Sequence, residues 1–323
     1  MTQSYHSDEV FIECWNRLGS PTLVAKELKM GARTVSQRKV SIESRHGISM
    51  PTHNSQKHKK KKKIEETPHN VRRGINIDNG RVLTFSDAHF WPDDETTAFR
   101  ALLLFIKEFK HSLKAIICNG DAFDGGAISR FPRIGWDKKP SVLEELNACK
   151  YFLGEIEKIR PPGCELIWTM GNHDSRYETL LAAQAPQFEG IPNFSLRDHF
   201  PLWKTCWSYW INEDTVVKHR WKGGWSAGRT NSLNAGVSII TGHTHALAVQ
   251  PITDYNGTRY GVQTGTLAEP NNMQFADYTE DNPKDWRSGF ALLSFHEGRL
   301  LMPEIIQVAG DNEIDFRGCI TKV

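Results

Sequence analysis

The sequence lacks the features that mark membrane, secreted and disulfide-stapled proteins. No apolar run approaches the roughly 18 residues needed to cross a bilayer. Residues 1–10 show no signal-peptide pattern, so we expect neither a membrane partner nor secretion. The six cysteines form no CxxC pair and no disulfide framework, which indicates reduced, mostly buried thiols in a cytoplasmic protein. With 39% apolar and 24% charged residues among 323, the chain is expected to fold.

Charge is divided unevenly along the chain. Residues 1–75 hold 15 Lys and Arg against 7 Asp and Glu, a net charge of +8. The remainder holds 25 against 31, a net charge of −6. A small basic module joined to a larger acidic one points toward a polyanionic partner. We expect three parts: a helical module over 1–48, a linker over 49–75 and a catalytic domain over 76–323.

Three short helices are predicted over residues 7–18, 21–29 and 32–45, since their apolar residues recur at helical spacing. The arrangement resembles the helix-turn-helix modules of DNA-binding regulators and mobile-element proteins. Two positions depart from that pattern: Lys29 replaces the usual turn glycine, and Arg38 stands where an apolar residue is common. The resemblance implies that the third helix enters the major groove with Arg33, Thr34, Gln37, Arg38 and Lys39. A bundle that only packs against the larger domain or another protein is the alternative.

The predicted linker holds six lysines in seven residues, including Lys59, Lys60, Lys61, Lys62 and Lys63. Like charges at this density repel one another, so the segment is predicted to be a flexible tether. Next to a DNA-binding candidate, we expect these lysines to neutralise phosphates. A solvated linker without a partner is the alternative.

Five apolar, strand-like runs in the larger part each end in residue types that bind metal ions. The clusters are Asp87-Ala88-His89, Gly120-Asp121-Ala122-Phe123-Asp124, Gly171-Asn172-His173-Asp174, His219 and Gly242-His243-Thr244-His245. Helical patterns over 94–110 and 141–160 separate the first three runs, which predicts an α/β fold. Sites in such folds gather at the carboxyl ends of strands. Each cluster alone is common by chance, but the set predicts one metal centre.

Carboxylate, imidazole and amide ligands without thiolate suit Mn²⁺, Fe²⁺ or Zn²⁺ rather than a structural zinc site. An Asp that bridges two such ions holds them roughly 3.5–4 Å apart. The pair generates hydroxide at neutral pH and clamps a phosphoryl oxygen for in-line attack. A His beside the metals can protonate the leaving alkoxide. The composition of the clusters therefore fits phosphoester hydrolysis.

The order DxH, GDxxD, GNHD, a lone His and GHTH over residues 76–270 resembles the calcineurin-like metallophosphoesterase superfamily. The resemblance implies a four-layer αββα sandwich, two divalent metal ions with Mn²⁺ as the first choice, and phosphomonoester or phosphodiester hydrolysis by a metal-bridging hydroxide. The implied ligands are Asp87, His89 and His245 for one metal, Asn172, His219 and His243 for the other, and Asp121 between them.

The same resemblance implies that His173 donates the proton and that Asp174 accepts its ring N–H. Asp124 would lie behind the ligands or contact substrate. The fourth motif usually has Gly after its His, whereas this chain has Arg220. His219 is nevertheless the first choice for that ligand, because it follows the apolar run at 215–217 and precedes GHTH at a reasonable distance, and His199 is the alternative.

The motifs and the segments next to them restrict the class of substrate only in part. The second motif lacks the Arg of the superfamily's protein phosphatases, which argues against that class. Arg130 and Arg133, in the basic and aromatic segment 127–140, would pair with phosphate, or they belong to an ordinary surface loop. The tryptophans of segment 201–225 predict core or an interface, with base stacking as the alternative.

The basic N-terminal part favours DNA as the substrate, because a tether that binds DNA raises the local concentration of substrate at the site. We expect a DNA nuclease of a bacterial or phage-infected cell, on architectural analogy. One alternative is a small-molecule or nucleotide phosphodiesterase whose helical module serves assembly. Another is an inactive DNA-binding or scaffold protein. A homodimer is a further expectation.

Overall fold

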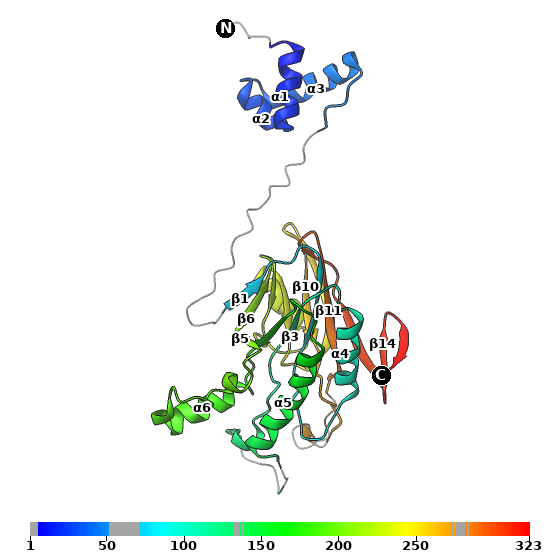
Figure 1. The fold of residues 1–323 in the computed structure, drawn as a ribbon. Coiled ribbons are helices and arrows are strands. Elements are labelled where there is room, and N and C mark those ends of the chain that lie inside the picture. The colour runs from blue at the N-terminus through cyan, green and yellow to red at the C-terminus, as the bar shows by residue number, and fades with distance from the viewer. Residues whose placement is uncertain are drawn as a thin grey trace. The chain divides into compact units, whose positions relative to one another are not determined.

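The computed structural model describes residues 6–51, 72–131, 136, 139–272, 274–275, 279, 282 and 284–323 (Figure 1). Two compact units divide the chain, one within Met1–Lys62 and the other within Lys63–Val323. The lysine run at 57–63, for which we predicted phosphate contact, lies outside the described residues. No helix in the described ranges is long and apolar enough to cross a lipid bilayer.

The N-terminal unit consists of α1 (Asp8–Leu18), α2 (Pro21–Glu27) and α3 (Ala32–His46), close to the three predicted ranges. The Ser7 hydroxyl caps the first helix by accepting from the Val10 N–H, and Gly19 ends it in the left-handed conformation. The helices share an apolar core of their own, made of Phe11, Cys14, Trp15, Val24, Ala25, Leu28, Val35, Ile42 and Met50.

Both departures from the helix-turn-helix pattern have a structural explanation. Lys29 takes up the left-handed backbone of the turn itself, with φ at +50°. The Arg38 guanidinium lies 5.2 Å from the centre of the Phe11 ring and 3.3 Å from Asp8 Oδ1. Arg38 is thus half-buried and held against α1, and its contact with DNA stays a prediction. Lys39 is also half-buried and pairs with Glu43 at 3.1 Å.

Two β-sheets form the centre of the second unit. The six-stranded sheet has the order β1 (Arg72–Ile75), β6 (Ser208–Ile211), β7 (Thr215–Val217), β8 (Ser238–Thr241), β10 (Gly257–Thr264) and β9 (Leu247–Asp254). The other sheet has the order β15 (Cys319–Lys322), β14 (Glu313–Phe316), β13 (Glu304–Gly310), β11 (Gly289–His296), β2 (Gly80–Phe85), β3 (Leu113–Cys118), β4 (Glu165–Thr169) and β5 (Lys204–Cys206), with β12 (Arg299–Leu300) beside β11. Since β1 pairs with β6, the catalytic unit includes Arg72, and the predicted linker end at 75 was too late.

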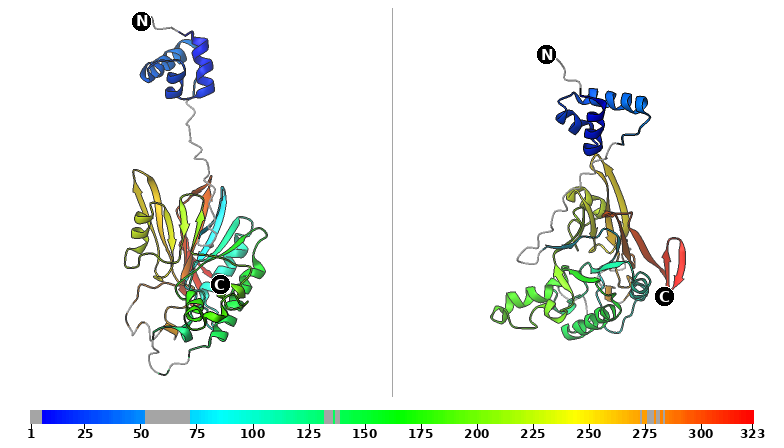
Figure 2. Two further views of the ribbon diagram at one scale, coloured as in Figure 1. Left: turned by 90° about the vertical axis from the view of Figure 1, so that its left-hand side faces the viewer. Right: turned by 45° about the horizontal axis from the view of Figure 1, so that its top comes forward.

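Alternate residues of the central strands face different layers. In β2, Val82 packs between the two sheets, whereas Leu83 packs toward the helices. Helices α4 (Thr97–Glu108) and α5 (Val142–Ile159) cover the outer face of the larger sheet (Figure 1). Helix α7 (Ala227–Ala235) packs on the smaller sheet, on the opposite side (Figure 2, left). The four-layer αββα sandwich is therefore confirmed.

Shorter elements complete the unit. They are η1 (Gly126–Ile128), α6 (Ser175–Gln184), η2 (Pro186–Phe188) and η3 (Leu196–His199). The predicted capping box is present at the start of α5, where Ser141 and Glu144 bond to each other's backbone N–H. Five cysteines are buried and Cys319 is exposed, as expected of core thiols. The C-terminal strands only extend the larger sheet.

Candidate metal centre

The predicted ligands lie in loops at the carboxyl ends of strands from both sheets. Strands β2, β3 and β4 run parallel in the larger sheet, and β7 and β8 run parallel in the smaller one. Each of these strands is followed directly by one of the five motifs. Five predicted ligands have a left-handed backbone, with φ between +40° and +69°: Asp87, His89, Asp121, His243 and His245. Non-glycine residues adopt this conformation rarely, and such strain concentrates at functional sites.

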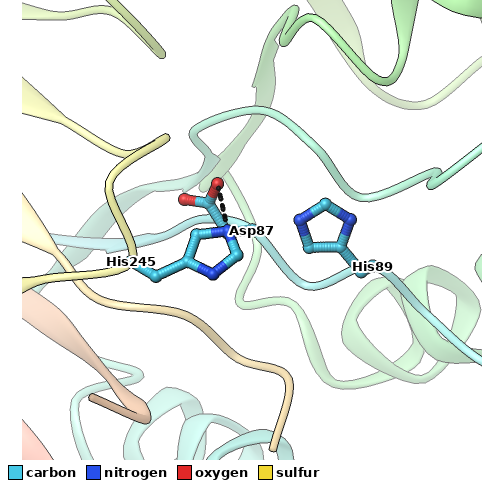
Figure 3. Close-up of side chains that lie close together, drawn as sticks. All are labelled: Asp87, His89 and His245. Carbon is cyan, nitrogen blue, oxygen red and sulfur yellow. Dashed lines mark ion pairs between the residues drawn. The ribbon is translucent and has the colours of Figure 1, made fainter. Parts of the chain in front are cut away.

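The first cluster consists of Asp87, His89 and His245, whose side chains come together from β2 and β8 (Figure 3). One ligand atom from each lies within 4.8 Å of the other two. His245 Nε2 is 3.3 Å from Asp87 Oδ1. Asp87 also accepts the backbone N–H of His243 at 2.8 Å, which ties the first motif to the last.

The second cluster consists of Asp121, His219 and His243, again with ligand atoms within 4.8 Å of one another. His219 Nε2 lies 3.0 Å from Asp121 Oδ2. Burial would lower the pKa of His219, but the Asp121 carboxylate raises it to about 10. This buried negative charge favours a cation beside Asp121, either a proton or a metal ion.

Three motifs contain a glycine that leaves room for a ligand side chain of another motif. A Cβ on Gly120 would lie 2.3 Å from His219 Nδ1. A Cβ on Gly171 would lie 2.0 Å from Asp121 Oδ1, and one on Gly242 would lie 2.6 Å from Asp87 Oδ2. Real side chains do not approach this closely, so each glycine leaves the space that a ligand occupies.

Hydrogen bonds behind two imidazoles leave their Nε2 atoms free for a metal. His219 Nδ1 lies 2.7 Å from the Asn119 carbonyl oxygen, which can only accept, so Nδ1 carries the proton. His89 Nδ1 lies 2.9 Å from Asp124 Oδ1 and donates to it in the same way. Burial lowers the pKa of His89, which favours the neutral form that ligates metals.

The residue that orients His173 is Asp124, and the prediction that Asp174 does so is wrong. His173 Nδ1 lies 2.8 Å from Asp124 Oδ1 and 3.0 Å from the Asp124 carbonyl oxygen. Asp124 thus accepts from His89 and His173 together. Burial would raise the pKa of Asp124, but these two hydrogen bonds hold it well below its usual value.

Asp174 instead stabilises the loops that carry the ligands. Its carboxylate accepts the backbone N–H groups of Asp121, Phe123 and Gly171 at 2.8, 3.1 and 2.8 Å. It also accepts from the indole N–H of Trp168 at 2.9 Å. With four donors around it and full burial, this carboxylate has no capacity left for the His173 ring.

Two residues that contact the second motif, or the glycines directly after it, were not predicted from the sequence. Arg176 donates to the Asp124 carbonyl oxygen at 2.9 Å, and its second terminal nitrogen lies 3.2 Å from His173 Nε2. The buried Glu145 accepts the N–H groups of Gly125 and Gly126, which follow Asp124 directly. The sequence held one indication of the contact between Arg176 and His173. Arg176 follows His173 by three residues at the start of α6, and residues at that spacing lie on the same face of a helix.

Of the remaining predicted residues that the structure describes, none belongs to either cluster. The alternative ligand, His199, lies in η3, where its Nε2 is 3.0 Å from the Asn193 carbonyl oxygen, so His219 is the residue that joins the centre. Arg130 is exposed, with its guanidinium 5.1 Å from the centre of the Phe131 ring. Arg133 lies outside the described residues. Trp203 of the aromatic stretch belongs to the core.

The buried polar atoms fit two divalent metal ions. Four of those without a hydrogen-bond partner among the described residues belong to predicted ligands: His89 Nε2, Asn172 Oδ1, His219 Nε2 and His245 Nδ1. Buried polar atoms are rarely left unpaired without a reason, and a bound ion is one such reason. Asp121 connects the second cluster with the third motif, because its Oδ2 faces His219 while its Oδ1 accepts the His173 backbone N–H at 2.8 Å.

Comparison with known proteins agrees with this geometry. The family model for calcineurin-like phosphoesterases matches residues 80–247, and the chain belongs to this family. The Gene 54 proteins of Mycobacterium phages L5 and D29 are 26% and 27% identical to it, over 71% of this chain and 94% of each relative. A solved archaeal phosphodiesterase is 14% identical, with a TM-score of 0.37, over 71% of this chain and 99% of that one.

The protein is therefore a metal-dependent phosphoesterase. Two divalent ions, when bound, supply a nucleophile derived from water and neutralise charge on the phosphoryl oxygens. The residues of the two clusters would hold these ions, and His173 lies beside the clusters, with its Nε2 4.0 Å from Asp121 Oδ2 and its Nδ1 fixed by Asp124. Burial lowers the pKa of His173, but Asp121 and Asp124 more than offset this, so that its pKa is raised. A raised pKa favours the protonated imidazole that a general acid needs.

Proposed function

We propose that this phosphoesterase hydrolyses phosphodiester bonds in DNA. The observation that carries the proposal is the combination of a two-cluster metal centre with a separate basic helical unit. Residues 1–71, which precede β1, hold 13 Lys and Arg against 7 Asp and Glu, a net charge of +6, whereas the rest of the chain is acidic. A catalytic unit for small nucleotides has no evident need of such a module. A polyanion, in contrast, binds it by releasing counterions.

The exposed face of α3 supports contact with DNA. Arg33, Thr34 and Gln37 are exposed there, and none of the three is needed for the core of the helical unit. Their side chains are of the kinds that bond to base edges and phosphates. The turn at Lys29 has the left-handed backbone that places two helices at an angle in helix-turn-helix proteins.

We further propose Mn²⁺ as the metal and a phage-infected bacterial cell as the setting. The ligand set of imidazole, carboxylate and one amide suits Mn²⁺, with Fe²⁺ and Zn²⁺ as alternatives. The setting rests on the two mycobacteriophage relatives, which match over nearly their whole length.

The experiment is hydrolysis of single-stranded and double-stranded DNA in Mn²⁺, alongside bis(p-nitrophenyl) phosphate. The intact protein is compared with its Asp121→Ala variant, because Asp121 lies at the second cluster and contacts the third motif. We expect both activities in the intact protein and neither in the variant. DNA cleavage that persists in the variant would come from a contaminating nuclease and would not support the proposal.

The second candidate is a phosphodiesterase for small nucleotides in which the helical unit serves assembly. It is favoured by the engagement of Arg38 and Lys39 within that unit, which leaves fewer free cations on α3. Robust hydrolysis of bis(p-nitrophenyl) phosphate with DNA left intact would select this candidate.

A further inference from the structure

An exposed aromatic and basic loop adjoins the metal centre. It runs from Arg220 to Ser226, with the sequence RWKGGWS, and connects the ligand His219 to helix α7. Every residue of this loop is exposed. The exposed fraction is 47% for Trp221 and 91% for Trp225. Large aromatic side chains left in water two and six residues after a metal ligand call for a function.

The base of this loop is fixed, although its tip is exposed. Asn231 of α7 is buried, and its side-chain amide both donates to the Lys222 carbonyl oxygen and accepts the Lys222 N–H, each at 3.0 Å. Helix α7 packs so tightly on β10 that a Cβ on Gly261 would lie 2.0 Å from the Gly228 carbonyl oxygen. Gly224, at φ +96°, turns the chain at the tip. The tryptophans are therefore presented from a rigid support.

The charge around the loop is of one sign. No Asp or Glu occurs between Thr215 and Thr253, whereas Lys218, Arg220, Lys222 and Arg229 all lie in that stretch. This basic region stands within a part of the chain whose net charge is −6. Arg220 directly follows the ligand His219, and Lys218 directly precedes it. Positive charge thus extends from the loop to the metal ligands.

Exposed tryptophans beside lysine and arginine fit a strand of unpaired nucleotides better than they fit a protein partner or duplex DNA. Proteins bind single strands by stacking aromatic side chains on bases and by lining the backbone path with Lys and Arg. The core of a protein–protein interface, in contrast, is depleted of lysine. In duplex DNA the bases are stacked on each other and cannot pack against Trp225.

We propose that the loop 220–226 binds single-stranded DNA next to the scissile phosphate, with Trp221 and Trp225 stacked on bases and Lys222 on a phosphate. The inference rests on the proposed function, because it assumes a DNA substrate. It adds that the substrate is unpaired where it enters the centre, as in a single strand or a flap.

Binding is measured by fluorescence anisotropy of a labelled oligothymidylate, using the full-length His173→Ala protein in Mn²⁺ so that the strand is cleaved slowly. Adding Trp225→Ala should weaken binding by about 5- to 150-fold, the range for loss of one stacked base. Tyr255→Ala is the matched control, since Tyr255 is a fully exposed aromatic in the turn between β9 and β10. It should leave the affinity unchanged.

Two further measurements make the test specific. A duplex of the same length should lose little affinity in the Trp225→Ala variant, because its bases are not available for stacking. Lys222→Ala should reduce the slope of log affinity against log salt concentration by about 0.7, the effect of one phosphate contact on a single strand. A structural role of these exposed residues would not change that slope.

The outcomes separate this inference from the proposed function. Unchanged oligothymidylate affinity in Trp225→Ala and in the Trp221→Ala, Trp225→Ala double variant, with DNA cleavage intact, overturns the loop's role alone. An equal loss for duplex and single strand also overturns it. A protein that hydrolyses bis(p-nitrophenyl) phosphate but neither binds nor cleaves DNA overturns both proposals.

Discussion

Substitution of Gly171 by Ala tests whether the glycines of the motifs exist to admit ligands. The new Cβ would lie 2.0 Å from Asp121 Oδ1, whereas real Cβ atoms essentially never come within 3.0 Å of another atom. The carboxylate must therefore retreat by at least about 1 Å. Rotation of the side chain cannot relieve the clash, because the Asp121 backbone nitrogen is only 2.6 Å away.

The expected result is a large loss of activity in a protein that still folds. A displacement of about 1 Å in a catalytic group costs on the order of 10²-fold in rate. Overpacking of this kind costs about 1–3 kcal/mol of stability. We therefore expect Gly171→Ala to lower kcat on bis(p-nitrophenyl) phosphate by about 10²-fold or more and to raise the Mn²⁺ concentration needed for half activity. A modest fall in Tm should accompany these changes.

Gly154→Ala is the matched control. Gly154 lies within α5, and a Cβ there would meet nothing within 4 Å. Because Ala is a better helix former than Gly by about 1 kcal/mol, this variant should be fully active and slightly more stable. Normal kcat and normal Mn²⁺ dependence in Gly171→Ala would refute the packing argument, and equal losses in both variants would point to misfolding.

Four further variants test the roles assigned to the site and to the helical unit. His173→Ala should slow turnover by about 10²–10⁴-fold while metal analysis still finds two ions per chain, and metal loss would show that its role is misassigned. Asp124→Asn should weaken metal affinity by about 10- to 100-fold and lower kcat, since an amide oxygen replaces the carboxylate between His89 and His173. Asp174→Asn should instead cost about 1–3 kcal/mol in denaturant unfolding, and equal effects of the two Asn variants on kcat would contradict the separation of roles. Deletion of residues 1–71, which spares β1, should impair cleavage of long DNA and leave bis(p-nitrophenyl) phosphate hydrolysis unchanged; parallel losses would deny the helical unit a role in substrate binding.

The motifs were predictable from sequence because each follows a strand directly. Apolar runs such as residues 113–118 identify a buried strand, and parallel strands must end at the same edge of a sheet. The polar residues that follow then converge without further information. The alternation of strands and helices likewise predicted an α/β fold, whereas the four layers were implied by the resemblance of the motifs to the calcineurin-like superfamily.

The hydrogen bonds behind the ligands could not be predicted in the same way. Asp124 and Asp174 are both acidic residues close to a motif, and nothing in the order of residues says which one meets the His173 ring. Their roles depend on where the loop backbone places its N–H groups, and Asp174 is taken up by four donors. Arg38 posed the same difficulty, because its contact with Asp8 joins residues 30 positions apart.

The most direct measurement of the central claim is an anomalous difference map from crystals soaked in Mn²⁺. Two peaks roughly 3.5–4 Å apart are predicted, with Asp121 between them. One should lie among Asp87, His89 and His245, and the other among Asn172, His219 and His243. A single peak, or a pair of peaks that does not contact Asp121, would contradict the two-metal account.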